Sequence, residues 1–367
     1  MENGKTGRIA YSYMPEDWSQ EEFLRLGGFT VVCLNYNQLK YIEKSVAAAL
    51  AQDFPRLEMF FMDNASTDGS GDLLEKLVWQ YRGRHKVTVV RNEVNVYITG
   101  QWNIVSKLAT GNWLGMFCGD DVSHPDRVSL VAERIRKYPT LRGISTAAVD
   151  IDVATGQPLP DSHYVPAPYF AHGTDSWEDL AANFKSNGST SFWHKSLFAD
   201  PIPFVPLDDN YLHFRVFALN HGVNGPIFLY DSSIKTIDYS IGVGICGGGI
   251  KGDKDDSPRR RWVVEIARYR VFLKKLVRTM REALAYGGEK RLAEHDLSPF
   301  VCTLWWNRMR AANTLERLLL ATPYFAFLVS ARVSYARKRS MVWDFFYYLT
   351  LEFFGLDVAS WIRSLRQ

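Results

Sequence analysis

Apolar runs alternate with helical stretches at a regular spacing from Phe29 onward, and this alternation limits the possible folds most strongly. The run 29–34 precedes a turn and an alanine-rich stretch, 39–52, with helical character. Similar runs follow at 57–62, 86–91 and 112–118, and we expect a helix after each of them, the last two over 99–109 and after Ser123. This spacing predicts βαβ units, and hence an α/β, Rossmann-like domain with a mostly parallel sheet flanked by helices.

The composition is that of a globular protein. The 367 residues are 47% hydrophobic, which is enough for one large domain or two smaller ones. The cysteines have no CxxC spacing, so neither a zinc site nor a disulfide framework is indicated, and a reduced cytoplasmic chain is expected. The N-terminus lacks the pattern of a secretory signal, and no apolar run is long enough to predict a membrane span.

The rest of the chain differs from this regular part. Periodicity weakens over 141–255, where we expect an irregular half ending in the glycine-rich stretch 242–249, which acts as either a lid or a plain connector. From Pro258 onward, 20 Lys and Arg stand against 9 Asp and Glu, and the pattern is helical and aromatic. This region either packs on the catalytic domain or a second copy of the chain, or forms a peripheral membrane surface.

Asp120 and Asp121 follow the apolar run 112–118. One interpretation is that they cap the next helix. However, Ser123 and Asp126 form a capping-box-like S-x-x-D, and Pro125 suits a first helical turn, so we expect the cap to be supplied there. The two adjacent carboxylates are then available to a divalent cation, Mg²⁺ or Mn²⁺, which prefers oxygen ligands.

Three further segments carry candidate residues. Asp63 ends a predicted strand within DNASTDGS; it is either a turn residue or an acceptor for the ring N–H of a base. Tyr36 follows the neighbouring strand and either stacks on such a base or lies in the core. Asp208 and Asp209 precede a helical pattern, where they either favour the start of that helix or supply a general base.

Together, five segments resemble glycosyltransferase family 2, the inverting nucleotide-sugar transferases of the GT-A fold. The resemblance covers roughly Phe29 to Gly244. It is carried, in the family's order and spacing, by VVCLNYNQLKYIEKSVAAALAQDFP, LEMFFMDNASTDGS, NIVSKLATGNWLGMF, CGDDVSHPDRV and LDDNYLHFRVFALNHG. Many members have Asp-x-Asp-Asp where this chain has Cys118-Gly-Asp-Asp, and we interpret Cys118 as a small apolar residue that closes a strand.

The resemblance implies a role for each candidate residue. Leu34, Asn35 and Tyr36 would line the nucleotide base. Asp63 would hydrogen-bond that base, and Asp120 would face the ribose. Asp121 would hold the metal on the diphosphate. Asp209, with Asp208 as the second choice, would be the catalytic base, and Asn95 and Asn103 fall in the family's asparagine-rich stretch, although the usual Asn-x-Gly is not clean here.

The implied activity is inverting transfer of a sugar from a nucleotide-diphosphate sugar, UDP-linked by expectation, to a hydroxyl of a saccharide or lipid-linked acceptor in cell-envelope or exopolysaccharide synthesis. The alternative is an inactive nucleotide-sugar-binding scaffold. No nucleic-acid-reading motif is present. We expect an N-terminal extension (1–28), a GT-A domain (29–257) and a basic helical C-terminal region (258–367). Within the domain, residues 29–140 would bind the nucleotide and residues 141–257 the acceptor. We expect the protein to lie in the cytoplasm, either free or at the inner face of the cell membrane.

Overall fold

The computed structural model describes residues 7–152, 155–159, 168–175, 188–199, 201–202, 211–220 and 222–240. Asp208, Asp209, the glycine-rich stretch and the region from Pro258 onward lie outside the described residues. The predictions made for those parts therefore stay predictions.

Four parallel strands form the first half of the sheet, as the sequence predicts. They pair in the order β4-β3-β2-β5, with bounds β2 (Phe29–Asn35), β3 (Glu58–Asp63), β4 (Lys86–Arg91) and β5 (Trp113–Cys118). Almost every residue of β2 and β3 is buried, as expected for parallel strands covered on both faces. Their carboxyl ends meet at one edge, where Asn35 lies beside Asp63 and Leu34 beside Cys118.

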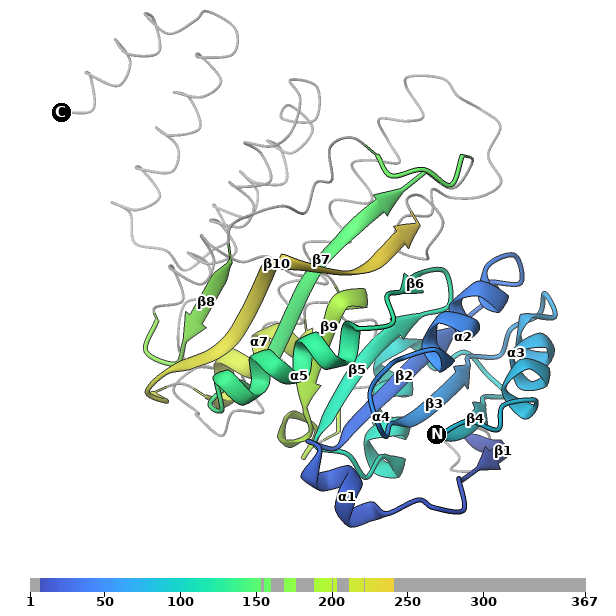
Figure 1. Cartoon of the computed structure of the whole chain (residues 1–367), viewed down its shortest axis with the longest axis horizontal. Coiled ribbons are helices and arrows are strands. Elements are labelled where there is room, and N and C mark those ends of the chain that lie inside the picture. The colour runs from blue at the N-terminus through green and yellow to red at the C-terminus, as the bar shows by residue number, and fades with distance from the viewer. Residues whose placement is uncertain are drawn as a thin grey trace, which may run out of the picture. The chain divides into compact units, whose positions relative to one another are not determined.

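Helices cover both faces of this parallel half. One face is covered by α2 (Ile42–Leu50), α3 (Ser70–Trp79) and α5 (Arg127–Lys137), whose apolar residues share one core with the strands. The opposite face carries α4 (Tyr97–Leu108), which lies behind the sheet in Figure 1. On that side Trp102 of α4 packs against Phe198, with ring centroids 5.5 Å apart.

The first residues of the chain contribute to the sheet, which the sequence pattern did not reveal. Strand β1 (Arg8–Tyr13) pairs antiparallel with β4 at the edge of the sheet. Helix α1 (Gln20–Arg25) follows, and the Ser19 side chain accepts a hydrogen bond from Glu22 N at 3.2 Å as its N-cap. Because β1 is short and lies at an edge, half of its side chains face solvent and its sequence lacks a clear apolar pattern.

The second half of the sheet is more regular than expected. β7 (Gly143–Ile151) runs parallel to β10 (Pro226–Ser240), and smaller strands complete the sheet: β6 (Val122–Ser123), β8 (Tyr169–His172) and β9 (Ser191–His194). The short helices η1 (Gly188–Thr190) and η2 (Lys195–Phe198) flank β9. These strands contain buried hydroxyl residues that bond across the sheet, such as Thr146 with Thr236. Polar residues inside strands hide the alternation on which the prediction relied.

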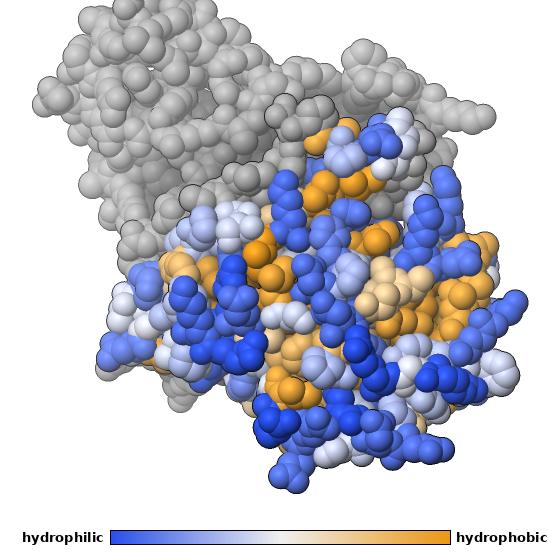
Figure 2. All heavy atoms as spheres, viewed as in Figure 1, coloured by the Kyte–Doolittle hydropathy of each residue, from blue (hydrophilic) through white to orange (hydrophobic). Residues whose placement is uncertain are grey.

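The expected helix after Asp209 is confirmed as α7 (Tyr211–Leu219). In the part of the chain that the structure describes, no helix combines the length and apolarity needed to cross a bilayer. Figure 2 shows hydrophilic side chains over much of the described surface on this face, with hydrophobic patches between them.

Candidate active site

Strained backbone gathers in the loops that follow the parallel strands. Among the described residues, three other than glycine have positive φ: Asn37 at 54°, Ala65 at 62° and Tyr97 at 58°. They lie after β2, β3 and β4 respectively, at the edge where ligands bind in open α/β sheets. Since left-handed backbone costs free energy in residues with a Cβ, its concentration at this edge indicates a functional constraint.

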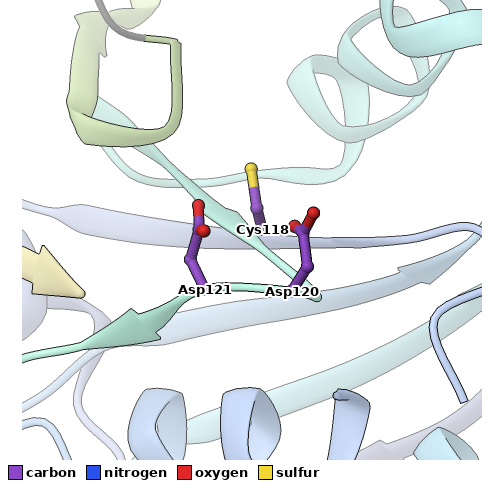
Figure 3. Close-up of side chains that lie close together, drawn as sticks. All are labelled: Cys118, Asp120 and Asp121. Atoms are coloured by element: carbon purple, nitrogen blue, oxygen red, sulfur yellow. The ribbon is translucent and has the colours of Figure 1, made fainter. Parts of the chain in front are cut away.

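Cys118, Asp120 and Asp121 form a compact group at the same edge. One potential ligand atom from each lies within 4.8 Å of the others. Figure 3 shows the three side chains rising on the same side of the turn between β5 and β6. Asp120 and Asp121 are 9% and 4% exposed, so both carboxylates are largely removed from water. The thiol of Cys118 therefore points with the acids, whereas we expected it to behave only as an apolar strand end.

The cap predicted from Ser123 and Asp126 is wrong. Helix α5 begins at Arg127, and Asp126 occupies the N-cap position without a side-chain hydrogen bond. Ser123 lies in β6, and its hydroxyl accepts a hydrogen bond from Arg127 Nη1 at 3.0 Å. Asp120 and Asp121 are separated from the helix by β6, so they do not cap it either. The turn that carries them is therefore distinct from the N-terminus of α5.

Burial perturbs the groups of this turn. It raises the pKa of Asp120, and backbone hydrogen bonding and a hydrogen bond with the Gln38 side chain oppose the rise only in part. Burial also raises the pKa of the Cys118 thiol, and the neighbouring Asp121 and Asp120 charges add to the rise. The thiol is therefore protonated near neutral pH in the absence of a metal, and ionised carboxylates are held here at an electrostatic cost that a bound cation would reduce.

The residues predicted to line a base lie next to this turn. Asn35 Nδ2 donates to Asp63 Oδ1 at 2.9 Å, and Asp63 Oδ2 accepts from Ser66 N at 3.3 Å. Both Asn35 and Asp63 are buried, whereas Leu34 and Tyr36 are half-buried, which excludes Tyr36 from the core. The carbonyl of Leu34 accepts from Gly119 N at 2.8 Å, so this loop is tied directly to the acidic turn.

Asparagines organise the third loop. Asn64 Nδ2 donates to exposed Asn95 Oδ1 at 3.0 Å, and Asn64 Oδ1 accepts from Asn92 Nδ2 and Val96 N. Asn95 thus lies at the same edge of the sheet as Asp63. Asn103 is used elsewhere, because its amide makes two hydrogen bonds of 2.6 Å with the backbone of Ile202. Its contacts indicate a structural role.

One buried residue near the acidic turn escaped the sequence analysis. Arg127 is fully buried, and its guanidinium contacts both flanks of the turn. Its position could have drawn attention to it, because the helix dipole disfavours a cation at the first residue of a helix.

Comparison with known proteins agrees with the fold. Residues 30–190 match the family model described as glycosyl transferase family 2. The chain is 27% identical over 149 residues to EpsE of Bacillus subtilis, covering 38% of this chain and 52% of EpsE. It is 32% identical over 117 residues to chondroitin synthase of Escherichia coli, covering 32% of this chain and 16% of that protein. The chain thus matches about half of one curated relative and a small part of the other.

A solved structure shows the same fold. Residues 1–349 of S. aureus TarS, in complex with UDP, superpose with a TM-score of 0.50 at 16% identity, covering 92% of this chain and 87% of that one. The parallel sheet with an acidic turn at its carboxyl edge is the GT-A glycosyltransferase fold. Residues 30–190 of this fold are the part of the chain that resembles glycosyl transferase family 2.

Proposed function

We propose that this chain transfers a sugar from a nucleotide-diphosphate sugar, UDP-linked by preference, to a hydroxyl of a saccharide or lipid-linked acceptor, with inversion at the anomeric carbon. The observation that carries the proposal is the Cys118, Asp120 and Asp121 group at the carboxyl edge of a family 2 domain. The matched relatives include a chondroitin synthase, which supports a polysaccharide as the product.

Each loop at the edge has a part in donor binding. Leu34, Asn35 and Tyr36 would form the wall beside the base, Asp63 would accept from its ring N–H, and Asp120 would accept from the ribose. Asn35 and Ser66 N hold the Asp63 carboxylate in a fixed orientation, which favours recognition of a planar ring. Asn95 would border this pocket from the third loop.

The donor set suits a hard divalent cation only in part. Two buried carboxylates fit Mg²⁺ or Mn²⁺, whereas the thiol does not, so Asp121 is the proposed metal ligand and Cys118 is not. The bound metal would offset the charge that develops on the departing diphosphate. Asp209, or Asp208 beside it, would remove the proton from the acceptor hydroxyl as that oxygen attacks from the face opposite the nucleotide.

The test combines binding and turnover. Purified full-length chain is offered UDP-sugars and saccharide acceptors with Mn²⁺, with Mg²⁺ or with EDTA. We expect metal-dependent UDP release, a product anomer of opposite configuration by NMR, and a kcat lower by about 10²–10⁴ in Asp209→Asn with little change in UDP affinity. UDP binding without any turnover would favour the scaffold alternative, and absence of both binding and turnover would refute the proposal.

A further inference from the structure

The buried guanidinium of Arg127 holds the turn that carries Asp120 and Asp121. Arg127 Nη2 donates to the carbonyls of Met116 and Ser189, each at 2.7 Å, and Nη1 donates to Ser123 Oγ at 3.0 Å. Met116 precedes the turn in β5 and Ser123 follows it in β6. A single planar group therefore joins both ends of the turn and also the η1 segment.

The surroundings keep this guanidinium in place. Its central carbon lies 4.1 Å from the ring centroid of Phe117 and 5.2 Å from that of Phe192, in cation–π geometry. Burial lowers the pKa of Arg127 to about 10, which leaves it charged at neutral pH, and the Asp121 carboxylate favours that charge. A buried cation is costly, so its retention beside an acidic turn calls for a reason beyond packing.

We propose that Arg127 is a positioning residue for donor binding, which fixes the spacing of Asp120 and Asp121 by bridging Met116, Ser123 and Ser189. The assignment of a donor to this turn rests on the proposed function, but the bridging role does not. The fork of the guanidinium is essential, because an ammonium group has no rigid fork with which to reach three acceptors from one side chain.

The lysine variant separates geometry from charge. Arg127→Lys keeps the cation and loses the fork, whereas Arg127→Met loses both. If bridging is the role, both variants should weaken binding of the Mn²⁺–UDP pair about tenfold by calorimetry, and both should speed amide hydrogen exchange in peptide 117–123 about tenfold. Peptide 58–63, in the adjacent strand β3, should exchange as in the parent chain.

Arg134→Met is the matched control, because it removes another arginine of α5. Arg134 lies seven residues further along α5 and pairs with Asp231 at 2.8 Å, so both readouts should be unchanged in this variant. If Arg127 variants fail to fold, Ser123→Ala removes one of the three bonds with little change in volume. It should speed exchange of peptide 117–123 about threefold and weaken Mn²⁺–UDP binding to a similar extent.

The outcomes are distinct. Parent-like exchange and affinity in Arg127→Lys would overturn the bridging role, as would parent-like exchange in Ser123→Ala. If the parent chain itself binds no Mn²⁺–UDP, the proposed function fails, and the exchange data still decide whether Arg127 holds the turn.

Discussion

Strands β3 and β4 place an acidic residue opposite a basic residue at both of their ends, but the two pairs have different surroundings. At the amino end Glu58 lies opposite Lys86, and at the carboxyl end Asp63 lies opposite Arg91. Glu58 is fully buried and accepts from Lys86 Nζ at 3.0 Å, from Thr30 Oγ1 at 2.9 Å and from Thr110 N at 2.8 Å. These hydrogen bonds satisfy the Glu58 carboxylate completely, within the strand region of the fold.

The carboxyl end is arranged differently. Arg91 Nε lies 3.6 Å from Asp63 Oδ2, and the same guanidinium is drawn toward Asp72 and Glu75 of α3. Asp63 is held instead by Asn35 and the backbone of a loop with positive φ at Ala65. One end of the strand pair therefore stabilises the fold, and the other holds polar groups and strained loops in a defined shape, as a binding site requires.

The largest expected effect lies at the amino end. Glu58→Ala leaves Lys86, Thr30 and Thr110 without their acceptor, so the free energy of unfolding should fall by about 3–5 kcal/mol in urea denaturation. UDP affinity of the folded protein should be retained. Asp17→Asn, which breaks an exposed pair with Arg56, is the control and should change stability little. A similarly small loss for Glu58→Ala would contradict the contrast between the two ends.

Asp120→Asn should change the free energy of unfolding in the opposite direction, by raising it. Because burial raises the pKa of Asp120 in the fold, stability linked to its protonation is present below the unfolded pKa and is lost as pH rises through the folded pKa. Removing the charge should therefore stabilise the metal-free protein at neutral pH by about 0.5–2 kcal/mol, at the expense of donor binding.

Urea denaturation at several pH values checks this prediction. The gain from Asp120→Asn should disappear below the unfolded pKa of about 3.9, where the aspartate is protonated in both states. A loss of stability at neutral pH would show that Asp120 contributes to the fold as Glu58 does.

The smallest expected effect concerns the strained loop after β3. Ala65→Gly relieves a left-handed backbone at φ 62° and should stabilise the protein by about 0.5 kcal/mol, the difference between relieved strain and the added freedom of the unfolded chain. Ala47→Gly, at an exposed position inside α2, should instead cost about 1 kcal/mol. Thermal unfolding of both variants measures the two changes in stability. If Ala65→Gly destabilises the protein as Ala47→Gly does, the backbone at Ala65 is not strained.

The sequence predicted the parallel half of the sheet well, because its strands are buried on both faces and read as continuous apolar runs. In the structure Asp63, Asn35 and the acidic turn meet at one edge, because the carboxyl ends of neighbouring parallel strands converge. The sequence pattern missed β1, β7 and β10, where edge exposure and buried hydroxyls such as Thr146 remove the apolar pattern.

Local chemistry was harder to predict than topology. The capping box failed because Ser123 belongs to a strand that pairs with β10, a partner that no local pattern reveals. Arg127 was missed for a related reason, since its acceptors at Met116 and Ser189 are 11 and 62 residues away. Contacts over such distances depend on the tertiary arrangement and leave no signature in a short stretch of sequence.

The pairing of β6 with β10 also bears on the order in which the protein forms during synthesis. Ser123 pairs with Ile237, and Val122 with Asp238, so the strand that follows the acidic turn meets its partner only after more than a hundred further residues have been made. Closing so long a loop is slow compared with local pairing. The nascent chain would thus complete β2 to β5 first and acquire a finished acidic turn late, once the strands of the second half of the sheet have been made.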